Sequence, residues 1–358
     1  MAKNKIKKSK NKESIFRGNI TYKRISLVIA ILFLGVFLIF STYAWFSTAL
    51  NVKIKQFNMI VSKNSGLSIS FDAINFDSNV ELSRDIIITD LKKTYPTHLN
   101  RWSASGLTPV SSPGITNKNN YFFDIYQTGG VRYRSKEHTN GFIHVSKIAE
   151  TEPISYSRFV AFDVFFKNVT GSPIADNLYF DYGTEVTSQG EISEEMQGLV
   201  NSVRIGIVKV GTLGLDANPR DIQNLKCQGE CNSIIFEPNS QNHTNLSIER
   251  AEKYGIKLSD GERFPTYASN KVGGPLLVGD NVSGSEKLDL NYFTIQRTIH
   301  EEDFGRALFT VPDGITKARI YVWIEGQDID SLETDSEGSE LYINLNFIKD
   351  TAGYSVEP

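Results

Sequence analysis

Residues 319–328 read Arg-Ile-Tyr-Val-Trp-Ile-Glu-Gly-Gln-Asp, a run typical of a β-strand that is buried on both faces. One face of this extended chain carries aliphatic side chains and the other carries aromatic ones, namely Ile320, Val322 and Ile324 against Tyr321 and Trp323. Residues 159–166, Phe-Val-Ala-Phe-Asp-Val-Phe-Phe, form a second such run, in which Asp163 is the polar interruption. The two runs predict strands in the interior of a β-rich domain.

Other segments alternate apolar and polar residues with a period of two, which indicates strands with one buried face. Residues 67–71, 203–207 and 341–347 follow this pattern. Residues 52–61 follow it with a change of phase, because Val52 and Ile54 have the opposite parity to the apolar residues that come after them. A β-bulge near Gln56 would join the two phases.

Helical patterns are scarce along the chain. Ser193 is a candidate N-cap for a short helix that carries Met196 and Leu199 on one side, and residues 246–254 form a second candidate that ends at Gly255. Many short strands with few helices predict a mainly β fold, a jelly-roll or β-sandwich-like domain with one or two short helices. We expect one elaborated β domain over residues 47–358 in preference to two.

The N-terminus predicts a membrane segment. Residues 1–24 contain nine basic residues and one acidic residue, a balance of +8, and Ile25–Phe46 contains no charge. As a helix, those 22 residues would span ~33 Å, enough to cross the hydrocarbon of a bilayer. The basic run predicts a cytoplasmic tail at 1–24 and an extracellular domain after Phe46, which is a single-pass arrangement in the cell membrane.

The same segment also has features of a signal peptide. Thr42 and Ala44 place small residues three positions and one position before a cut between Ala44 and Trp45. The sequence leaves both outcomes open, with a retained anchor favoured over a secreted, cleaved protein. The domain after Phe46 holds 29 basic and 40 acidic residues, a balance of −11, which argues against nucleic acid as a partner.

Several strings in the chain resemble a group of exported surface proteins of Gram-positive bacteria, related in layout to the TasA/camelysin group of biofilm-fibre and surface proteins. The strings are Ser41–Phe46, Gly66–Ser70, Phe162–Asn168 followed by Gly171 and Ser172, Phe236–Asn239, and Arg319–Asp328. The resemblance implies a leader that a dedicated signal peptidase removes, and a jelly roll that polymerises by donating a terminal strand to a neighbour. If this applies here, Val52–Val61 would be the donor strand, completing an open sheet edge through main-chain hydrogen bonds.

The sequence therefore predicts a non-enzymatic cell-surface protein with a structural, adhesive or matrix-forming role. Its expected partners are the bilayer, through residues 25–46, and other copies of itself or other surface proteins. A surface module that binds cell-wall glycan or calcium is the alternative. A metal-dependent protease is disfavoured, because the string that starts at His300-Glu301 has Phe304 where a zinc-binding helix needs its second histidine.

Three candidate sites remain for this surface protein. Cys227 and Cys231 are the only cysteines, and outside the membrane we expect a disulfide that pins one loop in preference to free thiols. Trp102 is a candidate exposed contact residue, whereas Tyr321 and Trp323 fit packed core better than a glycan platform. Carboxylates after the buried strand favour a solvated loop, with a calcium site as the alternative, its ligands being Asp328, Asp330, Glu333 and Asp335. No other cofactor is expected.

Overall fold

The computed structural model describes part of the chain. The described residues are 27, 29–33, 52–62, 65–104, 106–116, 122–128, 143–148, 158–188, 193–239, 242–253, 276–278, 287–288, 292–294, 298–300, 303–331 and 339–350. Contacts divide the chain into two units, residues 1–49 and residues 50–358. In the first unit, residues 27 and 29–33 are helical. Among the described residues, no helix combines the length and the apolar character needed to cross a membrane.

Most of the predicted N-terminal features lie outside the described residues. These are the basic tail at 1–24, the greater part of Ile25–Phe46, and the cleavage positions Ala44 and Trp45.

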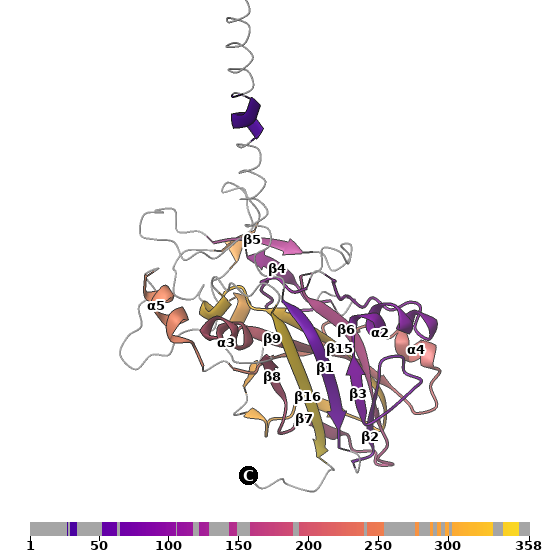
Figure 1. The fold of residues 1–358 in the computed structure, drawn as a ribbon. Helices are drawn as coiled ribbons and strands as arrows, with labels where there is room; N and C mark the ends of the chain where they lie inside the picture. Colours follow the sequence, from indigo (N-terminus) through magenta and orange to yellow (C-terminus); the bar gives the residue numbers. More distant parts are fainter. Residues whose placement is uncertain are drawn as a thin grey trace, which may run out of the picture. The chain divides into compact units, whose positions relative to one another are not determined.

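Residues 50–358 are built on two six-stranded sheets and one smaller sheet (Figure 1). The first sheet has the order β14 (Phe309–Val311), β7 (Asp176–Phe180), β16 (Glu340–Asp350), β1 (Lys53–Val61), β3 (Asn79–Leu82), with β8 (Glu185–Ser188) also paired to β16. The second sheet has the order β13 (Thr298–His300), β10 (Asn232–Glu237), β9 (Val203–Leu213), β15 (Gly314–Ile324), β6 (Val160–Asn168), β2 (Leu67–Ser70). The third has the order β12 (Lys287–Leu288), β11 (Leu276–Val278), β5 (Ile143–Ile148), β4 (Ile125–Thr128).

The first and last strands of this unit, β1 and β16, are neighbours in the first sheet and run parallel (Figure 1). Their pairing begins at Lys53 opposite Glu340 and ends at Val61 opposite Phe347. The register shifts between Ile54 and Gln56, which confirms the predicted β-bulge. The other edge of β1 pairs with β3 in the antiparallel sense.

The two large sheets pack face to face through aromatic side chains. Four ring pairs each join a strand of the first sheet to a strand of the second, namely Phe57 with Phe162 at 5.4 Å, Phe347 with Phe166 at 5.2 Å, Phe309 with Phe166 at 6.3 Å, and Phe180 with Phe236 at 4.6 Å between ring centroids. One hydrophobic cluster contains residues from both inner faces. The prediction of a mainly β fold with few short helices is confirmed.

The outer face of the second sheet is also buried, so every residue of β15 is buried. Segments that contact this face carry Tyr95, Val110, Phe123 and Ile222, the last from helix α4 (Pro219–Gln223). Helices α2 (Arg84–Ile88) and η2 (Asp90–Lys93) precede Tyr95 and place Ile87, Ile88 and Leu91 in the cluster on the inner face. Trp102 lies in one of these segments and is 6% exposed, so the prediction that it is an exposed contact residue was wrong. The neighbouring Arg101 pairs its backbone with Ala161 of β6, which holds this segment against the sheet.

A buried ionic group lies on this outer face and centres on Asp163. Its carboxylate is 2.7 Å from Arg319 Nη1 and 3.2 Å from Lys317 Nζ, and it accepts a 2.7 Å hydrogen bond from the Tyr95 hydroxyl. Burial alone would raise the pKa of Asp163, but the two cations and the hydrogen bonds outweigh it and hold the pKa below its ordinary value. Asp163 therefore stays ionised and compensates two buried cations.

The two predicted helices are present. Helix α3 (Glu194–Asn201) begins after Ser193, whose hydroxyl accepts a hydrogen bond from the Met196 amide, and helix α5 (Asn245–Lys253) matches the second candidate. Both helices contact η6 (Ile329–Ser331), a short helical turn that follows β15.

Replacing Asp163 with alanine would leave Arg319 and Lys317 buried without their carboxylate. We expect Asp163→Ala to lower the free energy of unfolding by ~3–5 kcal/mol in urea titrations. The control is Lys55→Ala, which removes an exposed ion pair with Glu340 and should cost less than ~1 kcal/mol. Equal losses in the two variants would contradict this account of the outer face.

Candidate functional site

Three carboxylates lie where the chain leaves β15. Glu325, Asp328 and Asp330 are at most 1% exposed, so the prediction that this segment is a solvated loop was wrong. The physical reason is that residues 325–331 are held under their neighbours by backbone hydrogen bonds. The amide of Glu325 donates to Ser202 O at 2.8 Å, and the amide of Gly326 donates to Val110 O at 2.9 Å.

Arg204, from β9, is the cation of this region. Its side chain is fully buried, and its guanidinium lies 2.6 Å from Asp328 Oδ2 and 3.3 Å from Glu237 Oε1. Glu237 ends β10 and is 1% exposed, so the ion pair joins two neighbouring strands to the turn after β15. We call Glu237, Glu325, Asp328 and Asp330, together with Arg204 and His243, the acidic cluster.

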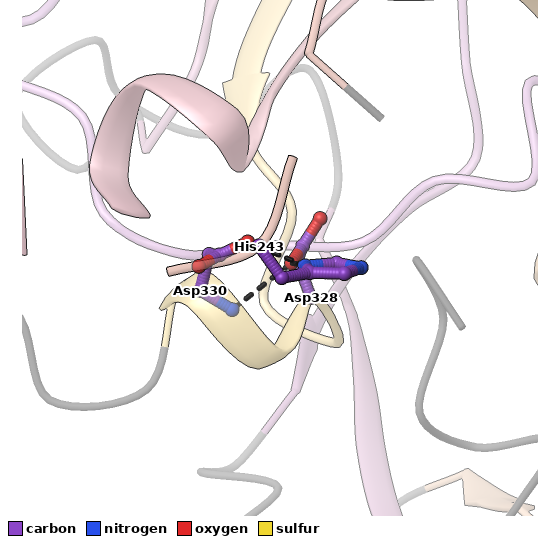
Figure 2. A group of neighbouring side chains, drawn as sticks. All are labelled: His243, Asp328 and Asp330. Carbon is purple, nitrogen blue, oxygen red and sulfur yellow. Dashed lines mark hydrogen bonds and ion pairs between the residues drawn. The ribbon is translucent and has the colours of Figure 1, made fainter. Parts of the chain in front are cut away.

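His243 lies two residues before the first residue of helix α5 and contacts both aspartates (Figure 2). Its Nδ1 is 2.6 Å from Asp330 Oδ2 and 3.8 Å from Asp328 Oδ1. The other oxygen of Asp330 accepts a 3.1 Å hydrogen bond from the amide of Thr244, at the start of α5. An anion is stabilised there, because the first amides of a helix point out of its N-terminal end.

The acidic cluster holds more negative than positive charge. Among the described residues, three of its four carboxylates, those of Glu237, Asp328 and Asp330, form ion pairs, and their partners are Arg204, His243 and His300. Burial raises the pKa of Glu325 to about 7, although Ser111, Trp323 and the Gln327 amide donate hydrogen bonds to it. Burial likewise raises the pKa of Asp328 to about 6, against the opposing effect of Arg204. The cluster therefore takes up protons close to neutral pH.

The same geometry offers ligands for a metal ion. Nδ1 of His243 and one oxygen from each of Asp328 and Asp330 lie within 4.8 Å of one another. One imidazole nitrogen with two carboxylate oxygens suits Mn²⁺ or Zn²⁺ better than Ca²⁺, which prefers oxygen ligands alone. Of the four residues chosen from the sequence as calcium ligands, the structure brings Asp328 and Asp330 together, whereas Glu333 and Asp335 lie outside the described residues.

Sequence reasoning missed His243, Arg204 and Glu237. They lie far from Asp328 along the chain, and no local spacing links them to the carboxylates. The fold brings them together because β9, β10 and β15 are consecutive in the second sheet.

The two cysteines lie between α4 and β10. Cys227 and Cys231 form a disulfide with their Cα atoms 5.5 Å apart, a spacing that suits such a bond. The amide of Cys231 donates to Thr116 Oγ1 at 3.2 Å, so the closed loop is also tied to a distant segment of the chain.

Comparisons with known proteins leave the site to be interpreted from its own geometry. No protein-family model, no curated protein and no solved structure matches this chain. The string that begins at His300 does not form a zinc-binding helix, because His300 ends strand β13 and the ring of Phe304 packs against that of Phe236 at 5.8 Å. Chemically, the acidic cluster can hold protons or a cation.

The raised pKa values predict that stability falls as pH rises. The folded protein binds protons at Glu325 and Asp328 that the unfolded chain has already lost. The contribution of each carboxyl is complete below its ordinary pKa, 4.5 for Glu325 and 3.8 for Asp328, and is lost as pH passes its raised pKa of about 7 and about 6, respectively. Each carboxyl should lower the free energy of unfolding by up to ~1 kcal/mol per pH unit within that window. Urea titrations at pH 5, 6, 7 and 8 measure this slope.

Glu325→Gln should flatten the slope and be more stable than the wild type at pH 8, because it removes a buried charge and keeps a hydrogen-bond acceptor. Glu230→Gln, at an exposed position, is the matched control and should leave the profile unchanged. A wild-type slope that Glu325→Gln does not alter would contradict the assignment.

Proposed function

We propose that this protein is a non-enzymatic structural or adhesive component of a bacterial cell surface that assembles by exchanging its first β-strand between copies. The proposal takes residues 25–46 as the segment that anchors the chain or directs its export. The uncharged stretch, the basic tail before it and the acidic domain after it support this location. The position of β1 is the observation that carries the assembly mechanism.

Strand β1 comes first in residues 50–358 but lies inside a sheet rather than at its edge. It is paired on one side with β16, almost 290 positions away in sequence, and on the other with β3. Its connection to the rest of the unit runs from its C-terminal end through residues 62–66 into β2. A strand attached in this way can leave its place and be replaced by β1 of a second copy with the same register.

The vacated place would be a deep apolar groove. Phe57, Met59 and Val61 are at most 1% exposed and would leave three empty core positions between β16 and β3. Burying each such side chain contributes ~1.5–3 kcal/mol, so an open groove is costly and is stabilised by capturing another strand. Exchange between copies restores every contact that opening removes.

The finer fold assignment belongs to the same proposal. Most strand pairs in the described sheets are antiparallel, as in a jelly roll, and the parallel pairing of β1 with β16 is one of three exceptions. In strand exchange, this parallel pair is the contact that forms between subunits.

A disulfide between β1 and β3 tests the proposal. Ile60 and Asn79 are opposite one another and exposed, so Ile60→Cys/Asn79→Cys should lock β1 in its own sheet. We expect the full-length oxidised variant to form no fibres or ladders of oligomers by electron microscopy and native electrophoresis. Reduction should restore the assembly seen with the wild type.

The matched control is Thr187→Cys/Tyr342→Cys, which locks β8 to β16 in the same sheet and leaves β1 free. This control should assemble in both redox states. Assembly of the oxidised Ile60→Cys/Asn79→Cys variant, or a monomeric wild type at all concentrations, would overturn strand exchange.

A cation-dependent binding module is the second candidate function, and the acidic cluster favours it. The cluster combines an excess of buried negative charge with His243, Asp328 and Asp330 in ligand-like proximity. The glycan form of this alternative loses its support, because Trp102, the chosen contact residue, is buried.

Thermal unfolding with MnCl₂, ZnCl₂ or CaCl₂ tests the second candidate. An ion whose free concentration is a hundred times its Kd stabilises the folded protein by ~2.7 kcal/mol. We therefore expect Mn²⁺ or Zn²⁺ to raise the Tm of the wild type. The increase should be absent in His243→Ala and present in His98→Ala, a histidine outside the acidic cluster. Equal increases in wild type and His243→Ala, or none with any ion, would contradict the site.

A further inference from the structure

Three polar side chains occupy core positions at one end of the space between the two large sheets. In β16 the inward positions are taken by Leu341, Ile343, Leu345 and Phe347, and the next inward residue is Lys349. In β6 the same alternation runs through Val160, Phe162, Val164 and Phe166 to Asn168, and in β7 it runs from Phe180 and Leu178 back to Asp176. All three side chains are buried, with Lys349 7% exposed, Asn168 0% and Asp176 2%.

These side chains contact one another directly. Lys349 Nζ lies 2.7 Å from Asn168 Oδ1 and 2.8 Å from Asp176 Oδ2. Asn168 Nδ2 donates to the same Asp176 oxygen at 3.1 Å and to Val311 O at 2.7 Å. The carboxamide of Asn168 is thus held at both ends. Its oxygen contacts the amine of Lys349, and its nitrogen contacts the carboxyl group of Asp176.

A structural ion pair would need only Lys349 and Asp176. Asn168 contacts both of them. The amine lies beside the oxygen of its electrophilic carboxamide, and the carboxyl group, a possible proton donor, lies beside the nitrogen that would leave. Fixing the reacting groups in this way removes the entropic cost of bringing them together, which can supply much of the barrier to a slow reaction. Uncatalysed attack of an amine on an amide is such a slow reaction.

We propose that Lys349 and Asn168 join in an intramolecular isopeptide bond, with Asp176 as the catalytic acid and base. This modification goes beyond the proposed surface function and does not depend on strand exchange. It would connect β16 of the first sheet covalently to β6 of the second.

The reaction balances without a further reactant. Asp176 accepts a proton from the Lys349 ammonium, and the resulting amine attacks Cγ of Asn168 as its carbonyl electrons move to Oδ1. A new Nζ–Cγ bond forms, the Cγ–Nδ2 bond breaks, and Nδ2 departs with its two hydrogens and one proton transferred from the amine nitrogen through Asp176. Ammonia is released, and the remaining proton of the original ammonium stays on Asp176.

The surroundings of the three residues favour this chemistry. Phe166 precedes Asn168 on the inward face of β6, and Phe347 precedes Lys349 on the inward face of β16. The centroids of these two rings are 5.2 Å apart. Apolar burial holds the amine, the carboxamide and the carboxyl group in contact with one another. It also keeps out water, which would compete as a nucleophile.

Mass spectrometry of the full-length protein tests the proposal. Trypsin cleaves after Lys167, Arg204 and Arg319, and it does not cleave after an acylated lysine. We expect one branched peptide in which residues 168–204 are joined to residues 320–358, lighter than the sum of the two by one ammonia molecule. Separate peptides 168–204 and 320–349 from the folded wild-type protein would overturn the cross-link.

Two variants complete the design. Lys349→Arg keeps the positive charge beside Asp176 but removes the nucleophile, and Asp176→Asn keeps the shape of the side chain but removes the acid. Both should give separate peptides, and both should lose the high thermal stability that the cross-link confers on the wild type. A branched peptide that forms as fast in Asp176→Asn as in the wild type would overturn the role of Asp176.

Discussion

The complete burial of β15 is the constraint on which the rest of the structure depends. All eleven residues from Gly314 to Ile324 are buried, so both faces of the second sheet need a cover. The first sheet covers the inner face through edge-on and tilted aromatic contacts, and the segments that carry Tyr95, Phe123 and Ile222 cover the outer face. Because Lys317 and Arg319 point to the outer face, that cover can form only if Asp163 and Tyr95 accompany them.

Much of this fold could be predicted from local patterns. The two-sided burial of residues 159–166 and 319–324, the bulge near Gln56 and the cap at Ser193 each depend on a few neighbouring residues, and each is present. The acidic cluster could not be predicted, because carboxylates after a strand resemble a solvated loop unless their partners are known. Arg204 and His243, which make burial of Asp328 and Asp330 tolerable, lie 124 and 87 positions from the carboxylates they contact. The prediction that Trp102 is exposed was wrong for a related reason. Its neighbours in the sequence are small and polar, and they give no sign of the backbone pairing between Arg101 and Ala161 that holds this segment in place.

Buried polar groups meet three different fates in this one domain. Asp163 remains charged because two cations and a hydroxyl surround it. Burial raises the pKa of Glu325 and Asp328, because the one arginine near them lowers it by less than burial raises it. Lys349 and Asp176 form a pair of one basic and one acidic side chain, and both form hydrogen bonds with Asn168. The bond proposed between Lys349 and Asn168 would remove the charge of this group altogether.

The parallel pairing of β1 with β16 determines how the domain would respond to mechanical tension. Because the two strands run in the same direction, the N-terminal end of β1 and the C-terminal end of β16 lie at opposite ends of their shared ladder. A pull applied between the ends of the chain would therefore load the hydrogen bonds between these strands in shear, all of them together, and would not open them one at a time. Lys349 lies at the far end of that ladder, beyond Phe347, where a covalent link to β6 would pass the load directly into the second sheet.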